Sequence, residues 1–207
     1  MPRERLTLVG MMVSVVGAIL VFAVGTSAQL PANVMLVRGT IDGAEAGALS
    51  VKTKDGLTRV GLTEKTAYAA VFAARLRDIK KGEYVGITAR RGPAGGWQAV
   101  EVHIFPEAMR GLGEGHYPWD FPGTTMTNAA VAAVVQRVDG RLLTLTPKGQ
   151  SVQIVVPPTA TIVRVELQQV GLLRLGAGTV VVARKEADGS LTALRVYVGQ
   201  GGVMPPF

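Results

Sequence analysis

The strongest constraint on the fold is an internal repeat that spans most of the chain. Residues 76–104 run from Leu-Arg-Asp-Ile-Lys-Lys-Gly-Glu-Tyr-Val-Gly-Ile to Trp-Gln-Ala-Val-Glu-Val-His-Ile. Residues 172–198 return to this pattern, from Leu-Leu-Arg-Leu-Gly-Ala-Gly to Leu-Thr-Ala-Leu-Arg-Val-Tyr-Val. A further matching pair, at 49–53 and 143–147, lies upstream at nearly the same offset. Self-similarity of this kind predicts two copies of one structural unit.

The first copy reads as short strands with one helix-like segment. Alternation of apolar with polar or small residues predicts five strands, at 37–41, 49–53, 59–62, 84–90 and 97–105. The Lys-Asp-Gly run at 54–56 predicts a hairpin turn. Residues 69–76 are rich in good helix formers and are predicted to form a helix.

The second copy repeats this order. Strands are predicted at 132–138, 141–146, 150–156, 179–185 and 191–198. Residues 165–173 stand where the first copy has its helix, and they predict a shorter element there. Asp188-Gly189 marks the last turn.

Three strands, a helix and two more strands is the order of a five-stranded OB-type barrel. The sequence therefore predicts an all-β protein with a small helix per repeat, built as tandem duplicated OB-like five- or six-stranded β-barrels. Closing a sheet removes its exposed edges, which suits small domains without disulfides. A looser six-stranded barrel or a sandwich remains the alternative. The predicted domains are repeat 1 at 34–105, a connecting arm at 106–128, repeat 2 at 129–199 and a tail at 200–207.

The N-terminus has the three parts of a secretory signal. A basic start, Met-Pro-Arg-Glu-Arg, precedes an apolar run at 6–24 and the small residues Thr26 and Ala28. We predict a signal peptide at 1–28 and a mature protein that begins at Gln29. An uncleaved N-terminal anchor is the alternative, since about 19 apolar residues can just span a bilayer. The expected location is the periplasm or the cell exterior.

Charge and cysteine content narrow the possible partners. The chain has no cysteine, so stability must come from packing and thiol chemistry is excluded. A net charge of +7 can attract nucleic acid, anionic lipid or acidic polymer. The Lys and Arg residues are scattered singly and form no aromatic-studded basic stripe, so nucleic acid is not an expected partner. A membrane is expected to be contacted only through an uncleaved leader.

One segment, at 103–128, fits neither copy. It contains both histidines, one of the two tryptophans and three prolines. A stretch this long without alternation is not expected to be barrel strand, and an ordered loop of more than about 15 residues is uncommon unless it carries function. The structural interpretation is an arm that joins the two copies, with its aromatic residues plugging a barrel mouth. The glycines at 111, 113 and 115 indicate a tight, irregular path.

The arm supplies the candidate binding residues. A ligand site on it would use Glu107, Arg110, Glu114, His116, Trp119 and Asp120. Arg110 has an equally good structural role, since it can pair with Glu114 or Asp120 to hold the arm.

Nitrogen and oxygen ligands in this region also suggest a possible Zn or Cu site. The candidate metal ligands are His103, Glu107, Glu114, His116 and Asp120. Met109 and Met126 add soft sulfur, which suits copper. Against this, strand alternation groups Val100, Val102 and Ile104 on one face, which leaves His103 as a surface residue on the other. Two histidines without tight pairing fall short of a metal-site signature.

Catalysis has little support in the sequence. No Ser/His/Asp order and no nucleophile elbow are present. The glycines of the arm do not form a dinucleotide loop, because Tyr-Pro-Trp-Asp-Phe-Pro follows them and forbids the required helix. We expect that the protein is not an enzyme.

The arm resembles a family of exported proteobacterial proteins of unknown function. The motifs that carry the resemblance are His-Ile-Phe-Pro-Glu at 103–107, Met-Arg-Gly at 109–111, Gly-Glu-Gly-His at 113–116, Pro-Trp-Asp at 118–120 and Thr-Met-Thr-Asn at 125–128. The resemblance covers the leader, both repeats and the arm, and it implies no established activity. Relatives are sometimes labelled as metal-transporter permeases. A permease needs several membrane-spanning helices, whereas this chain offers at most one.

These observations predict an exported, non-enzymatic binding or envelope-associated protein that uses the arm. Its expected partner is an envelope protein, a glycan or a small ligand. Alternatives from other classes are a periplasmic Zn or Cu accessory protein and a polyanion-binding basic OB-like module.

Overall fold

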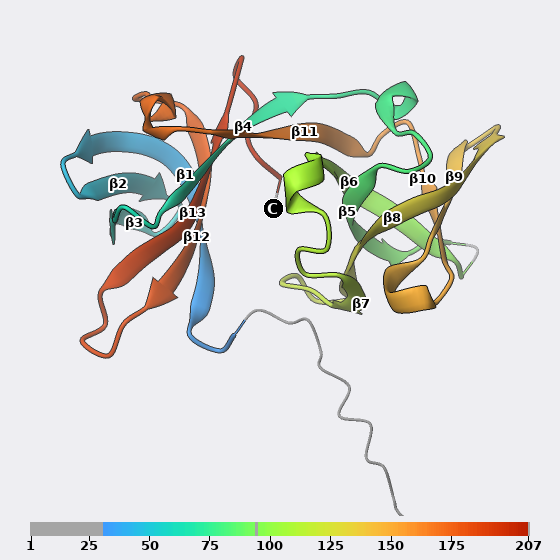
Figure 1. Ribbon diagram of the computed structural model, residues 1–207, viewed down its shortest axis with the longest axis horizontal. Helices are drawn as coiled ribbons and strands as arrows, with labels where there is room; N and C mark the ends of the chain where they lie inside the picture. Colours follow the sequence, from blue (N-terminus) through green and yellow to red (C-terminus); the bar gives the residue numbers. More distant parts are fainter. Residues whose placement is uncertain (1–30, 94, 207) are drawn as a thin grey trace, which may run out of the picture.

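The computed structural model describes residues 31–93 and 95–206 (Figure 1). The predicted leader at 1–28 lies outside these residues. Within the described part of the chain, no helix is both long and apolar enough to cross a membrane. The described residues form β-strands and short 3-10 helices, as an all-β sequence predicts.

The two copies have the same order of strands, and the second has an additional 3-10 turn, η3 (Pro147–Gly149), between its second and third strands. The strands of the first copy are β1 (Val34–Glu45), β2 (Ala48–Thr53), β3 (Gly56–Gly61), β4 (Ala67–Ala73), β5 (Tyr84–Arg91) and β6 (Trp97–Phe105). Those of the second are β8 (Thr124–Arg137), β9 (Gly140–Leu145), β10 (Val152–Val156), β11 (Thr161–Gln168), β12 (Gly178–Lys185) and β13 (Leu191–Gly199). Single 3-10 turns, η1 (Leu76–Asp78) and η4 (Val170–Leu172), precede the last two strands of each copy. Both predicted hairpin turns are present, between β2 and β3 and between β12 and β13.

The strands pair into two rings, and each ring mixes the two copies. The first ring runs β13-β12-β1-β2-β3 and returns to β13 through the pair Thr192 and Gly61. The second ring runs β6-β5-β8-β9-β10 and returns to β6 through Ile154 and Val155. Each ring therefore takes its first three strands from one copy and its closing hairpin from the other. The predicted division at 34–105 and 129–199 does not match this pairing, because the hairpins are exchanged.

β4 and β11 link the two rings (Figure 1). They pair antiparallel with each other, while β4 runs parallel to β13 and β11 runs parallel to β6. The prediction of a helix at 69–76 is thus wrong: residues 69–73 belong to β4, residues 74–75 are irregular, and Leu76 begins η1. The prediction of a short element at 165–173 is likewise replaced by the end of β11 and by η4. Backbone pairing on both sides of β4 and β11 outweighs the helix propensity of a few alanines.

Three apolar cores hold this arrangement together. Ile87, Ile104 and Leu143 belong to the core of the second ring. Ile41, Leu49 and Val196 belong to the core of the first. A third core lies in the seam, which we define as the space between the rings. Its members come from β4, β11, both rings and the arm: Ala69, Val71, Tyr84, Phe105, Met109, Val163, Val165, Val180 and Tyr197.

The predicted arm at 106–128 is partly strand. After η2 (Glu107–Met109), residues Gly115–Pro118 form β7, which pairs antiparallel with the start of β8. Residues 124–128 belong to β8 rather than to the arm. The expectation that this segment contains no strand is therefore wrong, since β7 finds its partner only once the chain turns back at Gly123.

Candidate functional site

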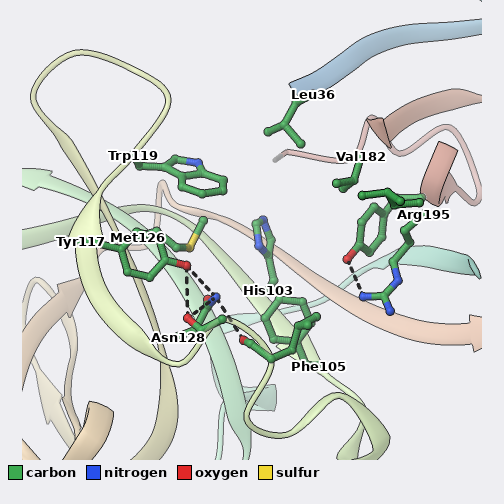
Figure 2. Close-up of a pocket in the computed structure, with 13 residues that line it drawn as sticks. Leu36, His103, Phe105, Tyr117, Trp119, Met126, Asn128, Val182 and Arg195 are labelled. Carbon is green, nitrogen blue, oxygen red and sulfur yellow. Dashed lines mark hydrogen bonds between the residues drawn. The ribbon is translucent and has the colours of Figure 1, made fainter. Parts of the chain in front are cut away.

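A cavity of about 310 Å³ lies in the seam, between the two rings and the arm (Figure 2). The first ring contributes Leu36, Val182, Leu194, Arg195 and Tyr197. The second contributes His103, Phe105, Met126 and Asn128, and the arm contributes Leu112, Gly113, Tyr117 and Trp119. Its wall therefore depends on segments far apart in the chain, and it forms only when the exchanged hairpins are in place.

Asn128 on β8 holds the arm against the cavity. Its side-chain amide donates to the Gly113 carbonyl at 3.2 Å and to the Tyr117 hydroxyl at 3.2 Å. Gly113 has a φ of +60°, and a Cβ there would lie 2.9 Å from the Asn128 amide nitrogen. A glycine is therefore required for this close approach. The Gly-Glu-Gly-His and Thr-Met-Thr-Asn motifs of the sequence are thus the two sides of one hairpin.

Replacing Asn128 by alanine is expected to destabilise the protein by about 1–3 kcal/mol, because the arm loses the donor to the partly buried Tyr117 hydroxyl and the donor to the Gly113 carbonyl. Chemical unfolding followed by circular dichroism measures the change. Gln136→Ala, which removes an exposed amide from the same strand, is the matched control and is expected to cost less than about 0.5 kcal/mol. Equal losses for the two variants would contradict the role given to Asn128.

A row of side chains on β6 faces the seam. Glu101, His103 and Phe105 are buried on this face. The expected grouping of Val100 with Val102 and Ile104 is wrong, because the β5–β6 register shifts at this point and leaves Val100 41% exposed. His103 is fully buried rather than a surface residue, because the face of β6 that it shares with Glu101 and Phe105 packs in the seam.

Burial controls the protonation of Glu101 and His103. It raises the pKa of Glu101 to about 7, although the Thr88 hydroxyl donates to its carboxylate at 2.6 Å and Arg38 favours the charged form. Burial lowers the pKa of His103 to about 4. His103 Nε2 lies 3.2 Å from the Pro206 carbonyl, which can only accept, so Nε2 carries the proton of the neutral ring. At neutral pH His103 is therefore uncharged.

Asp120 ties the arm to the first ring. Its carboxylate lies 3.0 Å from the Arg38 guanidinium of β1, and Arg38 also lies over the Phe121 ring at 5.2 Å. The tail contributes to the same region, since the Pro206 contact brings it to His103. Both segments therefore help to close the seam.

The other predicted arm residues have structural partners. Glu107 and Arg110 form a two-point ion pair, and Arg110 also donates to the Gly82 carbonyl at 2.9 Å. The expected pairing of Arg110 with Glu114 or Asp120 is replaced by this one. Glu114 accepts from the Lys148 backbone amide at 2.9 Å.

His116 points away from Tyr117 along β7 and contacts Thr127, with its Nδ1 at 2.7 Å from the hydroxyl. Its ring also meets the edge of Trp97 at 5.2 Å. Partial burial lowers its pKa, with Arg91 as a second cause. His116 and His103 therefore lie in separate surroundings.

The structure does not bring the predicted metal ligands together. Within the described residues, no group of three or more His, Asp or Glu side chains is placed to hold a metal ion. His103 is buried in the seam, His116 is on β7, and the three carboxylates of the set bind Arg110, Lys148 and Arg38. Alternation along β7 and the ion pairs of the arm separate residues that are close in sequence.

Of the predicted site residues, Trp119 and His103 line the cavity, and the others are not among its lining residues. Sequence reasoning missed Arg195, Tyr197, Leu36, Val182 and Tyr117. One signal was available: Arg195 and Tyr197 occupy the positions in the second copy that Glu101 and His103 occupy in the first.

Comparison of the chain with protein-family models, with curated proteins and with solved structures finds no match.

Proposed function

We propose that the protein is an exported, non-enzymatic binding protein that takes a small molecule into the seam cavity. We also propose that each ring is an OB-like barrel, which the order of the strands and the return pairings support. The observation that carries the function is the cavity itself, which is capped by the arm residues Tyr117 and Trp119. Ligand sites are typically concave, mainly apolar and placed between domains.

The lining favours binding over catalysis. Most of its side chains are aliphatic or aromatic, and no Ser, Thr, Cys, Asp, Glu or Lys is among the described residues that form it. His103 is held neutral by burial, and its Nε2 is occupied by Pro206. A cavity of about 310 Å³ has room for roughly ten non-hydrogen atoms if each takes the share of a water molecule, about 30 Å³.

Trp119 provides a direct test of this proposal. The chain has two tryptophans, so Trp97→Phe leaves Trp119 as the sole fluorescent indole. Addition of 3-phenylpropan-1-ol or 3-phenylpropanoate is expected to change its emission saturably, with at least one dissociation constant below about 1 mM, since small ligands gain roughly 0.3–1.5 kcal/mol per atom.

A cavity-filling variant identifies where the probe binds. Val182→Phe places extra volume in the cavity and is expected to abolish the fluorescence response. Val135→Phe makes the same change at an exposed site on β8 and is expected to leave it intact. If neither probe changes the emission, or if the two variants respond alike, the seam is not the binding site.

A further inference from the structure

We propose that the ligand of the seam cavity is a small aromatic carboxylate, whose carboxylate binds Arg195 and whose ring packs among the aromatic side chains of the wall. This inference rests on the proposed function and specifies its ligand class.

Arg195 supplies the charge complementarity. It is the one Arg, Lys, Asp or Glu among the described residues that line the cavity. Within the described part of the chain it forms no salt bridge, and its guanidinium lies against Tyr197, at 3.4 Å from the hydroxyl and 5.9 Å from the ring centre. A single guanidinium presents a planar fork of donors, and this geometry matches a carboxylate.

Two of the residues that line the cavity also carry buried donor atoms that lack an acceptor in the part of the chain that the structure describes. Arg195 Nε and Trp119 Nε1 are buried and have no hydrogen-bond partner among the described residues. Both groups can only donate, so the missing partners must be acceptors. The Asn128 carbonyl oxygen is also without a donor, but it lies against Gly86 of β5, where a Cβ would come within 2.6 Å of it. Buried polar atoms are normally satisfied, which indicates that a ligand supplies the acceptors.

Aromatic side chains are concentrated at this site. The chain contains two Trp, four Tyr and five Phe residues, and four of these line the cavity: Phe105, Tyr117, Trp119 and Tyr197. Figure 2 shows Trp119 and Tyr117 on one side, with His103 between them and the Arg195 wall. Tyr117 and Trp119 already pack edge to face at 6.1 Å, the arrangement in which a further ring is also stabilised.

The test compares a carboxylate with a neutral molecule of nearly the same size and shape. Isothermal titration calorimetry at pH 7.5 measures binding of 3-phenylpropanoate and 3-phenylpropan-1-ol to the purified protein. We expect the carboxylate to bind about 10-fold or more tightly than the alcohol, since a hydrogen bond to a charged group contributes about 1.5–3 kcal/mol.

Variants assign the preference to Arg195. Arg195→Met is expected to weaken carboxylate binding about 10-fold or more while changing alcohol binding less than about 3-fold. Arg59→Met removes an exposed arginine from the first ring and is expected to change neither. If Arg195→Met fails to fold, as judged by circular dichroism, Arg195→Lys keeps the charge without the planar fork and is expected to show a smaller loss.

The outcomes separate the two proposals. Binding of neither probe overturns the cavity as a binding site. Equal binding of acid and alcohol leaves the binding site standing but overturns the carboxylate assignment, as does an Arg195→Met or Arg195→Lys protein that keeps the full preference. Tighter binding of phenyl phosphate than of 3-phenylpropanoate would replace the carboxylate by a phosphate ester and also overturn the assignment.

Discussion

Gly39→Ala is expected to lower the free energy of unfolding by about 3 kcal/mol or more. Gly39 lies in β1, where Thr179 of β12 is its partner. A Cβ at this position would lie 2.1 Å from the carbonyl oxygen of Lys52 in β2 and 2.8 Å from its carbon. These are backbone atoms, so relief requires β1 and β2 to move apart at the pair Thr40 and Lys52.

The same strand offers a matched control. A Cβ at Gly43 would meet the nearest atom, the Ser50 Cβ, at 3.8 Å, which is ordinary contact. Gly43→Ala is therefore expected to lie within about 0.5 kcal/mol of wild type, or slightly above it, because alanine reduces the entropy of the unfolded chain. Urea unfolding of both variants measures the difference. If Gly39→Ala unfolds at the same urea concentration as Gly43→Ala, the close approach at Gly39 has no energetic consequence.

The strands were largely predictable because each shows its own alternation. The predicted strands at 84–90 and 97–105 differ from β5 and β6 by at most one residue at either end. The partner of each strand was not predictable, because alternation identifies the buried face and not the strand that covers it. Each closing hairpin could pair with the first three strands of either copy, and these two pairings are nearly equivalent. Contacts remote in sequence decide between them.

The helix predicted at 69–76 is wrong for the same reason, because contacts remote in sequence decide the structure of these residues. Residues 69–73 have the local composition of a helix, yet Ala69, Ala70 and Val71 are buried between β13 and β11. Small side chains allow close packing where the two rings meet. Local helix or strand propensity does not report this need for small side chains.

One side of the candidate site, the arm, could be predicted from the sequence, and the other could not. The arm could be identified because it interrupts the repeat, and Trp119 does line the cavity. The opposite wall comes from β12 and β13, whose approach to the arm depends on the hairpin exchange. The predicted metal ligands are not grouped because residues that are close in sequence need not be close in space: β7 places Tyr117 toward the cavity and His116 toward Thr127.

Glu101→Gln is expected to leave stability unchanged near pH 4 and to raise it by roughly 3 kcal/mol at pH 8, because each pKa unit corresponds to about 1.4 kcal/mol. The pKa of Glu101 is raised from 4.5 to about 7 by burial, so the folded state binds more protons than the unfolded state between these values. Stability from this group is therefore lost as pH rises from 4.5 to 7. Glutamine cannot ionise, and its carbonyl can still accept from Thr88.

The stability contributed by His103 changes with pH in the opposite direction, and in the wild type it offsets the change contributed by Glu101. Its pKa falls from 6.5 to about 4 on folding, so the folded state binds fewer protons and stability rises with pH between 4 and 6.5. Between pH 4.5 and 6.5, where both groups change protonation on folding, the two opposite changes in stability nearly cancel. Urea unfolding from pH 4 to 8 measures the difference in stability between each variant and the wild type. This difference should rise with pH for Glu101→Gln and fall with pH for His103→Gln.

Subtracting the wild-type curve removes the titration of groups that all the proteins share. Glu45→Gln, at an exposed carboxylate, is the matched control for the loss of one negative charge. A Glu101→Gln minus wild-type difference that stays constant from pH 4 to 8 would show that Glu101 is not desolvated in the folded protein. It would also show that the seam around it is open to water, because only exclusion of water from this face of β6 makes the ionised carboxylate costly.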